Sequence, residues 1–305
     1  SNVTGIYYSI IQKYYKSGNK HHIMADETTI TFTIPSINQE DLDRNFSIPM
    51  ASLFKYFQSA RMRLPWVGAG YASLSSETPQ ETRRLVVKTQ MVKCDANLRE
   101  TVANKDVNVV VNLGSIGRTT CEFRYTIKFN DEIVGNGVVL MVCVTGEPGS
   151  LTPSPMPERV RSLAPKDDAT EKKFMLDKSK IVSNMEIPKA SDCLFVHKLF
   201  VRYSDEDVNQ HANHSAYARY TQDAITNARA NDVIFSDQIQ TMILEYNAEA
   251  RANDICEVRL VKLEEEGDIA VFIIRLENAT KGNDEESELL IRGLVIISKH
   301  QKSAI

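Results

Sequence analysis

The chain has 305 residues, of which 42% are hydrophobic and 25% charged, so it suits about two folded domains and is not a disordered protein. Its formal net charge of -4 argues against nucleic acid as a partner, because nucleic-acid binding selects for a strongly basic surface. We find no apolar run long enough to span a membrane, and no signal peptide at the start. Five widely spaced cysteines without a CxxC motif indicate reduced thiols, and therefore the cytoplasm or another reducing intracellular compartment.

The first half of the chain reads as a strand, a helix and four more strands. Apolar and polar residues alternate from 28 to 37, which predicts a strand. Apolar residues recur at helical spacing after Pro49, which predicts a helix over residues 48–64. Runs bounded by turn residues predict the other strands, at residues 85–94, 107–113, 120–129 and 134–144. This order favours one helix laid against an antiparallel sheet.

The second half repeats that order after a segment rich in proline, glycine and charged residues. We assign residues 151–190 to a linker with a short helix near 157–163. The elements predicted beyond it are a strand at 193–203, a helix at 215–230 and strands at 240–248, 255–264, 269–276 and 289–298. The predicted domains are therefore residues 1–150 and 191–305.

An internal repeat supports the duplication. The segment before the first predicted helix lies over residues 205–211 without a gap, and its aspartate and asparagine match Asp207 and Asn209. Ser47 stands at the position of His211. Because a hydroxyl cannot replace an imidazole that titrates near neutrality, we expect the first copy to have lost any catalytic role.

Polar residues gather just before the second predicted helix. Asp207, Asn209 and His211 alternate along this loop, so in an extended backbone their side chains would lie on one side. Free N–H groups at the helix start could stabilise an oxyanion there. A carboxylate, an amide and an imidazole are suited to activating water against a polarised carbonyl. The simpler interpretation is a polar turn that caps the helix.

Other kinds of chemistry have little support in the sequence. His211 and His214 lie on one loop with no third ligand at a usual spacing, so we expect no metal site. Gly68 and Gly70 fit no phosphate-binding motif, and Ser215 lacks the G-x-S-x-G context of an α/β-hydrolase nucleophile. We expect no cofactor.

Two blocks resemble the acyl-ACP thioesterase family. DVNQHANHSAY, at residues 207–217, is similar to the family's D-x-N-x-H-x-N-N-x-x-Y signature, and LEYNAEA, at 244–250, is similar to L-E-Y-R-R-E-C. LGSIGRTTCEFRYTI, at 113–127, looks like strands of the wider 4-hydroxybenzoyl-CoA thioesterase-like group. The resemblance implies an α+β fold of two tandem hot-dog domains, each an antiparallel sheet wrapped around a central helix.

The resemblance also implies the catalytic set, which is Asp207, Asn209, His211 and Glu249. Asn209 would hold the thioester carbonyl, and either carboxylate would activate water, directly or through the imidazole; a covalent anhydride route also stays open. We expect the loop and a strand about forty residues later to bring these side chains into one pocket. Ala250 stands where the family has cysteine, which excludes a thiol nucleophile there.

We expect substrate contacts next to this set and on the first helix. Asn213 belongs to the signature, and His214 stands where the family has its second asparagine. Phe54 and Phe57 fit the core of the first half, and we expect them to border an acyl pocket if that half shapes it.

We therefore predict a thioesterase for acyl-CoA or acyl-carrier-protein thioesters, and we allow for a homodimer. Two alternatives stay open, an enoyl-thioester hydratase or dehydratase of the same fold and a non-enzymatic acyl-binding module. The motif context of the hot-dog hydratases is not found here, and binding alone needs no such set of carboxylate, amide and imidazole.

Overall fold

The computed structural model describes most of the two predicted halves. The described residues are 28–34, 48–64, 83–94, 106–129, 131–146, 150–164, 183–207, 210–236, 238–264, 267–276 and 287–297. The first copy of the internal repeat, Asn209 and the last residues of the first predicted strand lie outside them.

In the N-terminal half, one long helix packs against an antiparallel sheet. The helix begins at Met50 because Pro49 fixes the preceding backbone, and no side chain caps it. Its core face carries large apolar residues at helical spacing. The elements are β1 (Thr29–Ile34), α2 (Met50–Arg61), β2 (Arg84–Cys94), β3 (Val107–Ile116), β4 (Thr120–Phe129), β5 (Glu132–Thr145), β6 (Thr152–Pro153) and α5 (Glu158–Arg161).

The C-terminal half has the same order of helix and strands. The predicted strand at 193–203 ends earlier, because the chain turns into a short 3-10 helix. The loop that follows carries Asp207 and His211 and leads into the second long helix; we call it the site loop. The elements are η3 (Ala190–Asp192), β7 (Phe195–Phe200), η4 (Tyr203–Asp205), α7 (His214–Ala230), β8 (Ile239–Tyr246), β9 (Ile255–Lys262), β10 (Asp268–Leu276) and β11 (Ser287–Ile297).

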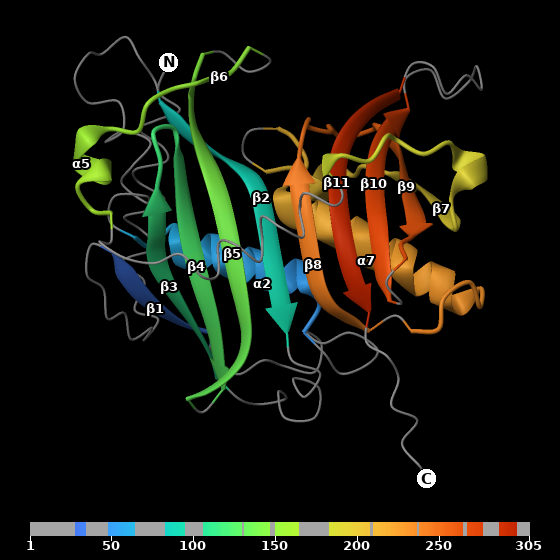
Figure 1. The fold of residues 1–305 in the computed structure, drawn as a ribbon, viewed down its shortest axis with the longest axis horizontal. Helices are drawn as coiled ribbons and strands as arrows, with labels where there is room; N and C mark the ends of the chain where they lie inside the picture. Colours follow the sequence, from blue (N-terminus) through green and yellow to red (C-terminus); the bar gives the residue numbers. More distant parts are fainter. Residues whose placement is uncertain are drawn as a thin grey trace.

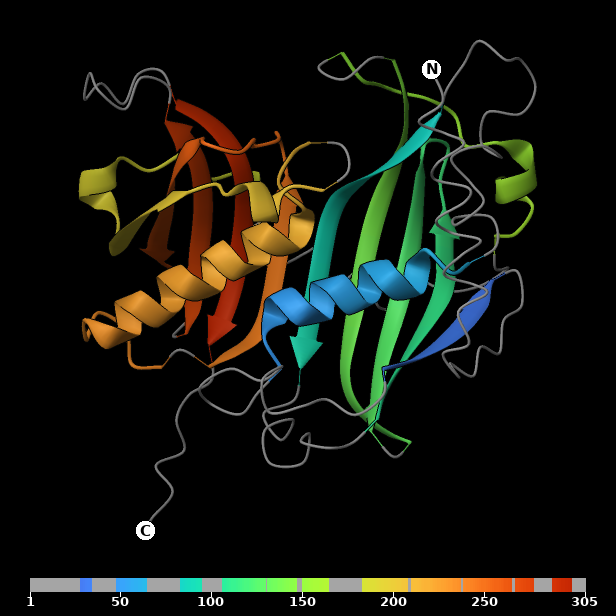
Figure 2. The ribbon, with the colours of Figure 1, turned by 180° about the vertical axis from the view of Figure 1, so that it is seen from behind.

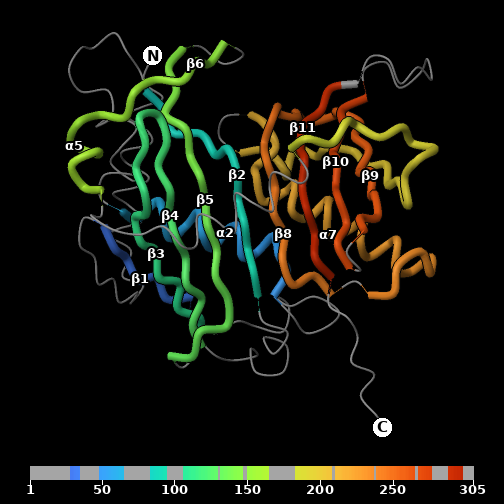
Figure 3. The backbone as a smooth tube through the Cα atoms, viewed as in Figure 1, coloured from blue at the N-terminus to red at the C-terminus, as the bar shows by residue number. Residues whose placement is uncertain are grey.

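The two sheets join edge to edge into one antiparallel sheet. Its order is β1-β3-β4-β5-β2-β8-β11-β10-β9-β7, so each half uses the same order and the halves meet at β2 and β8. The seam is a ladder in which Met91 lies opposite Ile243, and Figure 3 shows the two strands side by side. Pairing β2 with β8 removes one exposed edge from each half. The predicted tandem hot-dog fold is confirmed.

Both long helices lie on the same face of this sheet (Figure 2). The Met50 amide donates to Gln222 Oε1 at 3.1 Å, and Asn213 Nδ2 donates to Gln58 Oε1 at 3.3 Å. Because the start of α2 meets the middle of α7 and its end meets the start of α7, the helices are antiparallel. The site loop before α7 therefore lies beside the last turns of α2.

A glycine in β5 allows the core helix of the N-terminal half to approach the sheet. A Cβ atom at Gly137 would lie 2.1 Å from Cε2 of Phe57. The ring of Phe57 stacks on Tyr125 with 4.1 Å between ring centroids, and both side chains are fully buried. Any larger residue at Gly137 would displace this aromatic pair.

The end of the predicted linker crosses the outer face of the sheet. Arg292 donates to the Ser183 carbonyl, and Arg259 Nη1 donates to the Pro188 carbonyl at 2.7 Å. Met185 packs on the apolar outer face. None of the helices in the described part of the chain is long and apolar enough to cross a membrane.

Candidate active site

The start of α7 is fixed by its own cap. Asn213 Oδ1 accepts hydrogen bonds from the Ser215 amide and hydroxyl, both at 2.9 Å, while its Nδ2 donates to Gln58. The Ala216 amide donates to the Asn213 carbonyl at 2.7 Å. Both ends of the Asn213 amide are thus engaged inside the protein, so its predicted contact with substrate stays a prediction.

The loop before α7 is a tight turn. Glu206 and Ala212 pair as an antiparallel bridge, and the Asp207 amide donates to the His211 carbonyl at 2.9 Å. Gln210 adopts a positive φ of 63°, and its amide donates to the Asp207 carbonyl. The condition under which alternate side chains would share one side, an extended backbone, is therefore not met between Asp207 and His211. The turn, rather than alternation, sets Asp207 and His211 beside each other.

A second loop carries Glu249 to the first. We had expected Glu249 to come from a strand. β8 ends at Tyr246, so Glu249 lies in the loop just past the strand. The Ala212 amide donates to the Ala250 carbonyl at 2.8 Å, and the Ala250 amide donates to the Tyr217 hydroxyl at 2.8 Å. These two bonds hold the Glu249 loop against both the site loop and α7.

His211 lies between two carboxylates. Its Nδ1 is 3.8 Å from Asp207 Oδ1, and its Nε2 is 3.4 Å from Glu249 Oε1. The Asp207 and His211 side chains are each 23% exposed and that of Glu249 is 52% exposed, so a substrate can reach the group from solvent. The structure thus brings together all of the predicted catalytic residues that it describes; Asn209 lies outside the described residues.

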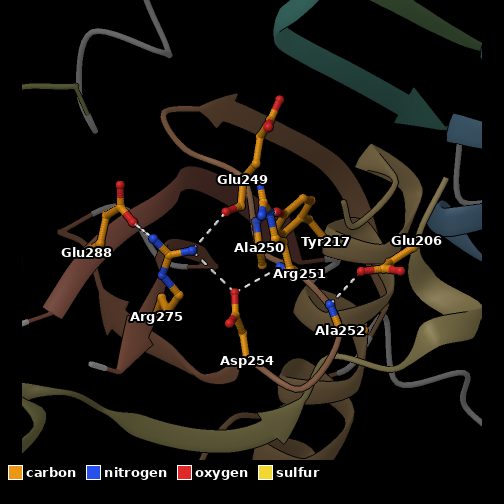
Figure 4. A network of polar contacts seen from close by, with 9 residues as sticks. All are labelled: Glu206, Tyr217, Glu249, Ala250, Arg251, Ala252, Asp254, Arg275 and Glu288. Atoms are coloured by element: carbon orange, nitrogen blue, oxygen red, sulfur yellow. Dashed lines mark hydrogen bonds and ion pairs between the residues drawn. The ribbon is translucent and has the colours of Figure 1, made fainter. Parts of the chain in front are cut away.

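The main chain at Glu249 is held from the other side by an arginine (Figure 4). Arg275 Nη1 donates to the Glu249 carbonyl at 3.2 Å and lies 3.3 Å from Asp254 Oδ2. The Ala252 amide donates to Glu206 Oε1 at 2.7 Å, which ties the same loop to the site loop. In Figure 4 the Glu249 carboxylate points away from Arg275. The backbone of Glu249 is thus fixed, while its carboxylate is directed toward the His211 ring.

Comparison with protein-family models indicates the family that this part of the chain resembles. Residues 189–289 match the family model of the acyl-ACP thioesterase C-terminal domain. This match covers most of the C-terminal half. The chain is accordingly a thioester hydrolase acting on acyl thioesters. No curated protein sequence matches it.

Solved structures share the fold of the whole thioesterase chain. The 12:0-ACP thioesterase from Umbellularia californica has a TM-score of 0.68 at 15% identity, over 90% of this chain and 98% of that one. An acyl-ACP thioesterase from Bacteroides thetaiotaomicron has a TM-score of 0.64 at 15% identity, over 89% and 99%. A MaoC-like dehydratase from Phytophthora capsici has a TM-score of 0.50 at 11% identity, over 90% and 96%. At these identities the likeness shows the fold alone, and the family match carries the activity.

The predicted substrate residues of this thioesterase lie where the two helices meet. His214 is partly buried, and its Nε2 is shielded from solvent. Burial, reinforced by the positive charge of Arg61, lowers its pKa to about 3, against the opposing effect of a hydrogen bond with the Phe54 backbone. The ring is therefore neutral at physiological pH. Phe54 and Phe57 are fully buried core residues of α2. Their contact with an acyl chain stays a prediction.

Asp205 is the residue that sequence reasoning missed. It is buried and accepts hydrogen bonds from the Tyr220 hydroxyl at 2.6 Å, from Arg219, and from the Arg202 amide at 3.0 Å. Burial alone would raise its pKa, but these hydrogen bonds together hold the pKa below the ordinary value. Its carbonyl accepts from the Asn213 amide at 2.8 Å, so one residue anchors both ends of the site loop. The repeat contained the signal, since an aspartate occurs at the matching position of the first copy.

No metal chemistry is indicated by the described residues. Among them, no three His, Cys, Asp or Glu side chains are placed to share a metal ion. The five cysteines all lie in described stretches, and each is a free thiol. Those at the core, Cys121 and Cys256, have pKa values raised to about 12 by burial, so neither is a ready nucleophile.

Proposed function

We propose that His211, Glu249 and Asp207, together with Asn209, hydrolyse the thioester bond of acyl-carrier-protein or acyl-CoA substrates. The observation that carries the proposal is the imidazole held between two carboxylates, 3.8 Å and 3.4 Å away, beside the start of α7. An imidazole that is flanked in this way can take a proton from water and return it to a leaving group.

The three described side chains have distinct roles in this proposal. Asp207, on the Nδ1 side, orients the ring and stabilises its protonated form. Glu249, on the Nε2 side and half-exposed, holds the attacking water with His211. The water oxygen adds to the thioester carbonyl carbon, and its proton passes to the imidazole–carboxylate pair. The C–S bond then breaks, and the sulfur leaves as a thiol by taking that proton, which leaves a free acid.

The developing oxyanion needs donors. The amides of Ser215 and Ala216 already have acceptors within the protein, so fewer helix-start amides are open than the sequence suggested. We therefore assign the oxyanion contact to the side-chain amide of Asn209. The positive end of the α7 dipole adds favourable potential beside His211.

The test is thiol release from a panel of acyl-CoAs and acyl-carrier proteins, with Glu249→Gln and Asp207→Asn beside the wild type. We expect Glu249→Gln to lower kcat by about 10²–10⁴-fold, as for loss of a general base, and Asp207→Asn to lower it less. Glu158→Gln, at an exposed glutamate of the other half, is the matched control. Full activity of Glu249→Gln would reject the assigned base.

The same assay separates the alternatives. A hydratase would consume an enoyl thioester without releasing thiol, and an acyl-binding module would bind the panel without turnover. A homodimer stays a prediction, to be checked by the mass of the protein in solution.

A further inference from the structure

A buried guanidinium in the N-terminal half has no counter-ion among the residues that the structure describes. Arg61, the last residue of α2, is 3% exposed, and its Nη1 donates to the Tyr125 hydroxyl at 2.9 Å. It lies 5.8 Å from the centre of the Phe123 ring, and its Nε has no acceptor. In the described stretches no carboxylate forms an ion pair with it. Since moving a charge out of water is costly, a buried arginine without a carboxylate calls for another partner.

Two more buried polar atoms without a partner belong to the same region. They are Nε2 of Gln90, on the seam strand β2, and Nε2 of His214, at the start of α7. Tyr246 connects them, because its hydroxyl lies 2.9 Å from Gln90 Oε1 and 3.2 Å from the His214 carbonyl. The charge of Arg61 reaches both His214 and Tyr246: it adds to the effect of burial in lowering the pKa of His214, and it opposes burial, which raises the pKa of Tyr246. The orphaned atoms therefore form one cluster between the helices and the seam.

The cluster contains both hydrogen-bond donors and a hydrogen-bond acceptor that lack partners. Arg61 Nε and Gln90 Nε2 are donors without acceptors. His214 is neutral, and a hydrogen bond to the Phe54 backbone fixes the proton on the other ring nitrogen, so Nε2 is an acceptor without a donor. A saturated hydrocarbon chain satisfies none of these atoms. A hydroxyl satisfies both kinds at once. A carboxylate accepts from the two donors and balances the charge of Arg61, but it offers no proton to His214 Nε2.

We propose that Arg61, Tyr125, Gln90 and His214 form a subsite for an oxygen function carried by the acyl group, so that the enzyme prefers hydroxylated or carboxylated acyl thioesters to plain ones. This deepens the proposed function and rests on it. His214 follows His211 by three residues, at the inner side of the same helix start. An acyl group that extends from a thioester at His211 into the core meets the subsite there.

The experiment compares four thioesters of one chain length: dodecanoyl-CoA, 3-hydroxydodecanoyl-CoA, 12-hydroxydodecanoyl-CoA and the mono-CoA thioester of dodecanedioic acid. We expect kcat/KM for at least one oxygenated substrate to exceed that for dodecanoyl-CoA by about tenfold or more, because a site built to pair with an oxygen rejects the chain without it. Arg61→Met should bring that ratio close to one. Arg63→Met, two residues farther along the chain at a partly exposed arginine just past the helix, is the matched control and should leave the ratio unchanged.

Thermal unfolding shows whether each variant is folded. If Arg61→Met does not fold, Tyr125→Phe removes a partner hydroxyl without changing the ring and should lower the same ratio. A wild type that prefers dodecanoyl-CoA, or a folded Arg61→Met with an unchanged ratio, would overturn the subsite and leave only water as the partner of these atoms. If no thioester is hydrolysed, the proposed function is rejected, and this result does not by itself decide the subsite. The subsite is then judged by whether dodecanedioic acid raises the melting temperature of the wild type more than dodecanoic acid does, and whether Arg61→Met removes this difference.

Discussion

α2 and α7 hold equivalent places in two copies of one fold, yet they differ at both the start and the buried face. α2 follows a proline, has no side-chain cap and buries the large side chains of Phe54 and Phe57. α7 starts with an asparagine cap and buries mainly small residues such as Ala224 and Ala228.

This difference shows how two copies of one fold come to have different roles. The small residues on the buried face of α7 take up little of the interior, while the start of α7 holds a polar loop at the protein surface. The bulky face of α2 fills its half of the interior, and its last turn places a cation there. The copies share an architecture because their patterns of apolar residues match, and they differ because few residues at each helix end set the chemistry.

The strongest test of this comparison exchanges the matching positions of the two copies. His211→Ala should lower kcat by about 10²–10⁴-fold, because it removes the general acid–base group. Asp43→Ala, at the position in the first copy that matches Asp207, should leave kcat nearly unchanged. Thiol release from the best substrate gives both numbers. Equal losses would mean two working sites, and an active His211→Ala would reject the catalytic histidine.

The second test concerns the anchor of the site loop. Asp205→Asn should lower the free energy of unfolding by about 2–3 kcal/mol, since it breaks a buried charge-assisted cluster in which Arg219 is partly exposed. Urea unfolding measures the loss. Asp232→Asn, at a 92% exposed carboxylate paired with Arg229, is the control and should cost under about 0.5 kcal/mol. A loss no larger than the control's would show that the loop does not depend on this anchor.

A smaller effect is expected where α7 holds the Glu249 loop. Tyr217→Phe leaves the buried Ala250 amide without an acceptor, which costs about 1–2 kcal/mol and loosens Glu249. We expect kcat to fall about tenfold with KM little changed, as for a positioning residue. Steady-state kinetics of Tyr217→Phe beside Tyr203→Phe, at a 75% exposed tyrosine, measure this. An unchanged kcat would mean that the remaining contacts, from Arg275, Ala212 and Glu206, hold the loop without Tyr217.

The smallest effect is a pH dependence at the contact of the two helices. His214 has a pKa of about 3 in the folded protein and an ordinary value of 6.5, so between these values the unfolded chain binds the extra proton. Stability is therefore lost as the pH falls below about 6.5, with a slope of at most about 1.4 kcal/mol per pH unit from this group. His214→Gln should show a shallower slope in unfolding measurements between pH 7 and pH 5. Identical slopes would contradict a buried neutral imidazole.

The fold was largely predictable because its local patterns are strong. Period-two alternation predicted the first strand, and turn residues marked the bounds of other strands in the first half. Helical spacing predicted the helix that begins beside Pro49. The family signature located His211 and Glu249 forty residues apart. Their closeness depends on hydrogen bonds such as that from the Ala212 amide to the Ala250 carbonyl. Backbone hydrogen bonds of this kind do not depend on which side chains are present, so they cannot be read from the sequence.

By itself, then, the sequence determined two copies of one helix-and-sheet unit and the set of polar residues before the second helix. The tertiary structure alone decided that β2 pairs with β8, that the site loop is a turn through Gln210, and that Asp205 anchors it. Arg61 shows the reason most clearly. In the sequence it is a cation in the last turn of a helix, where the helix dipole favours one at the surface. Only the packing of α2 against β4 turns it into a buried charge, because burial depends on what lies across the interior rather than on neighbours in the chain.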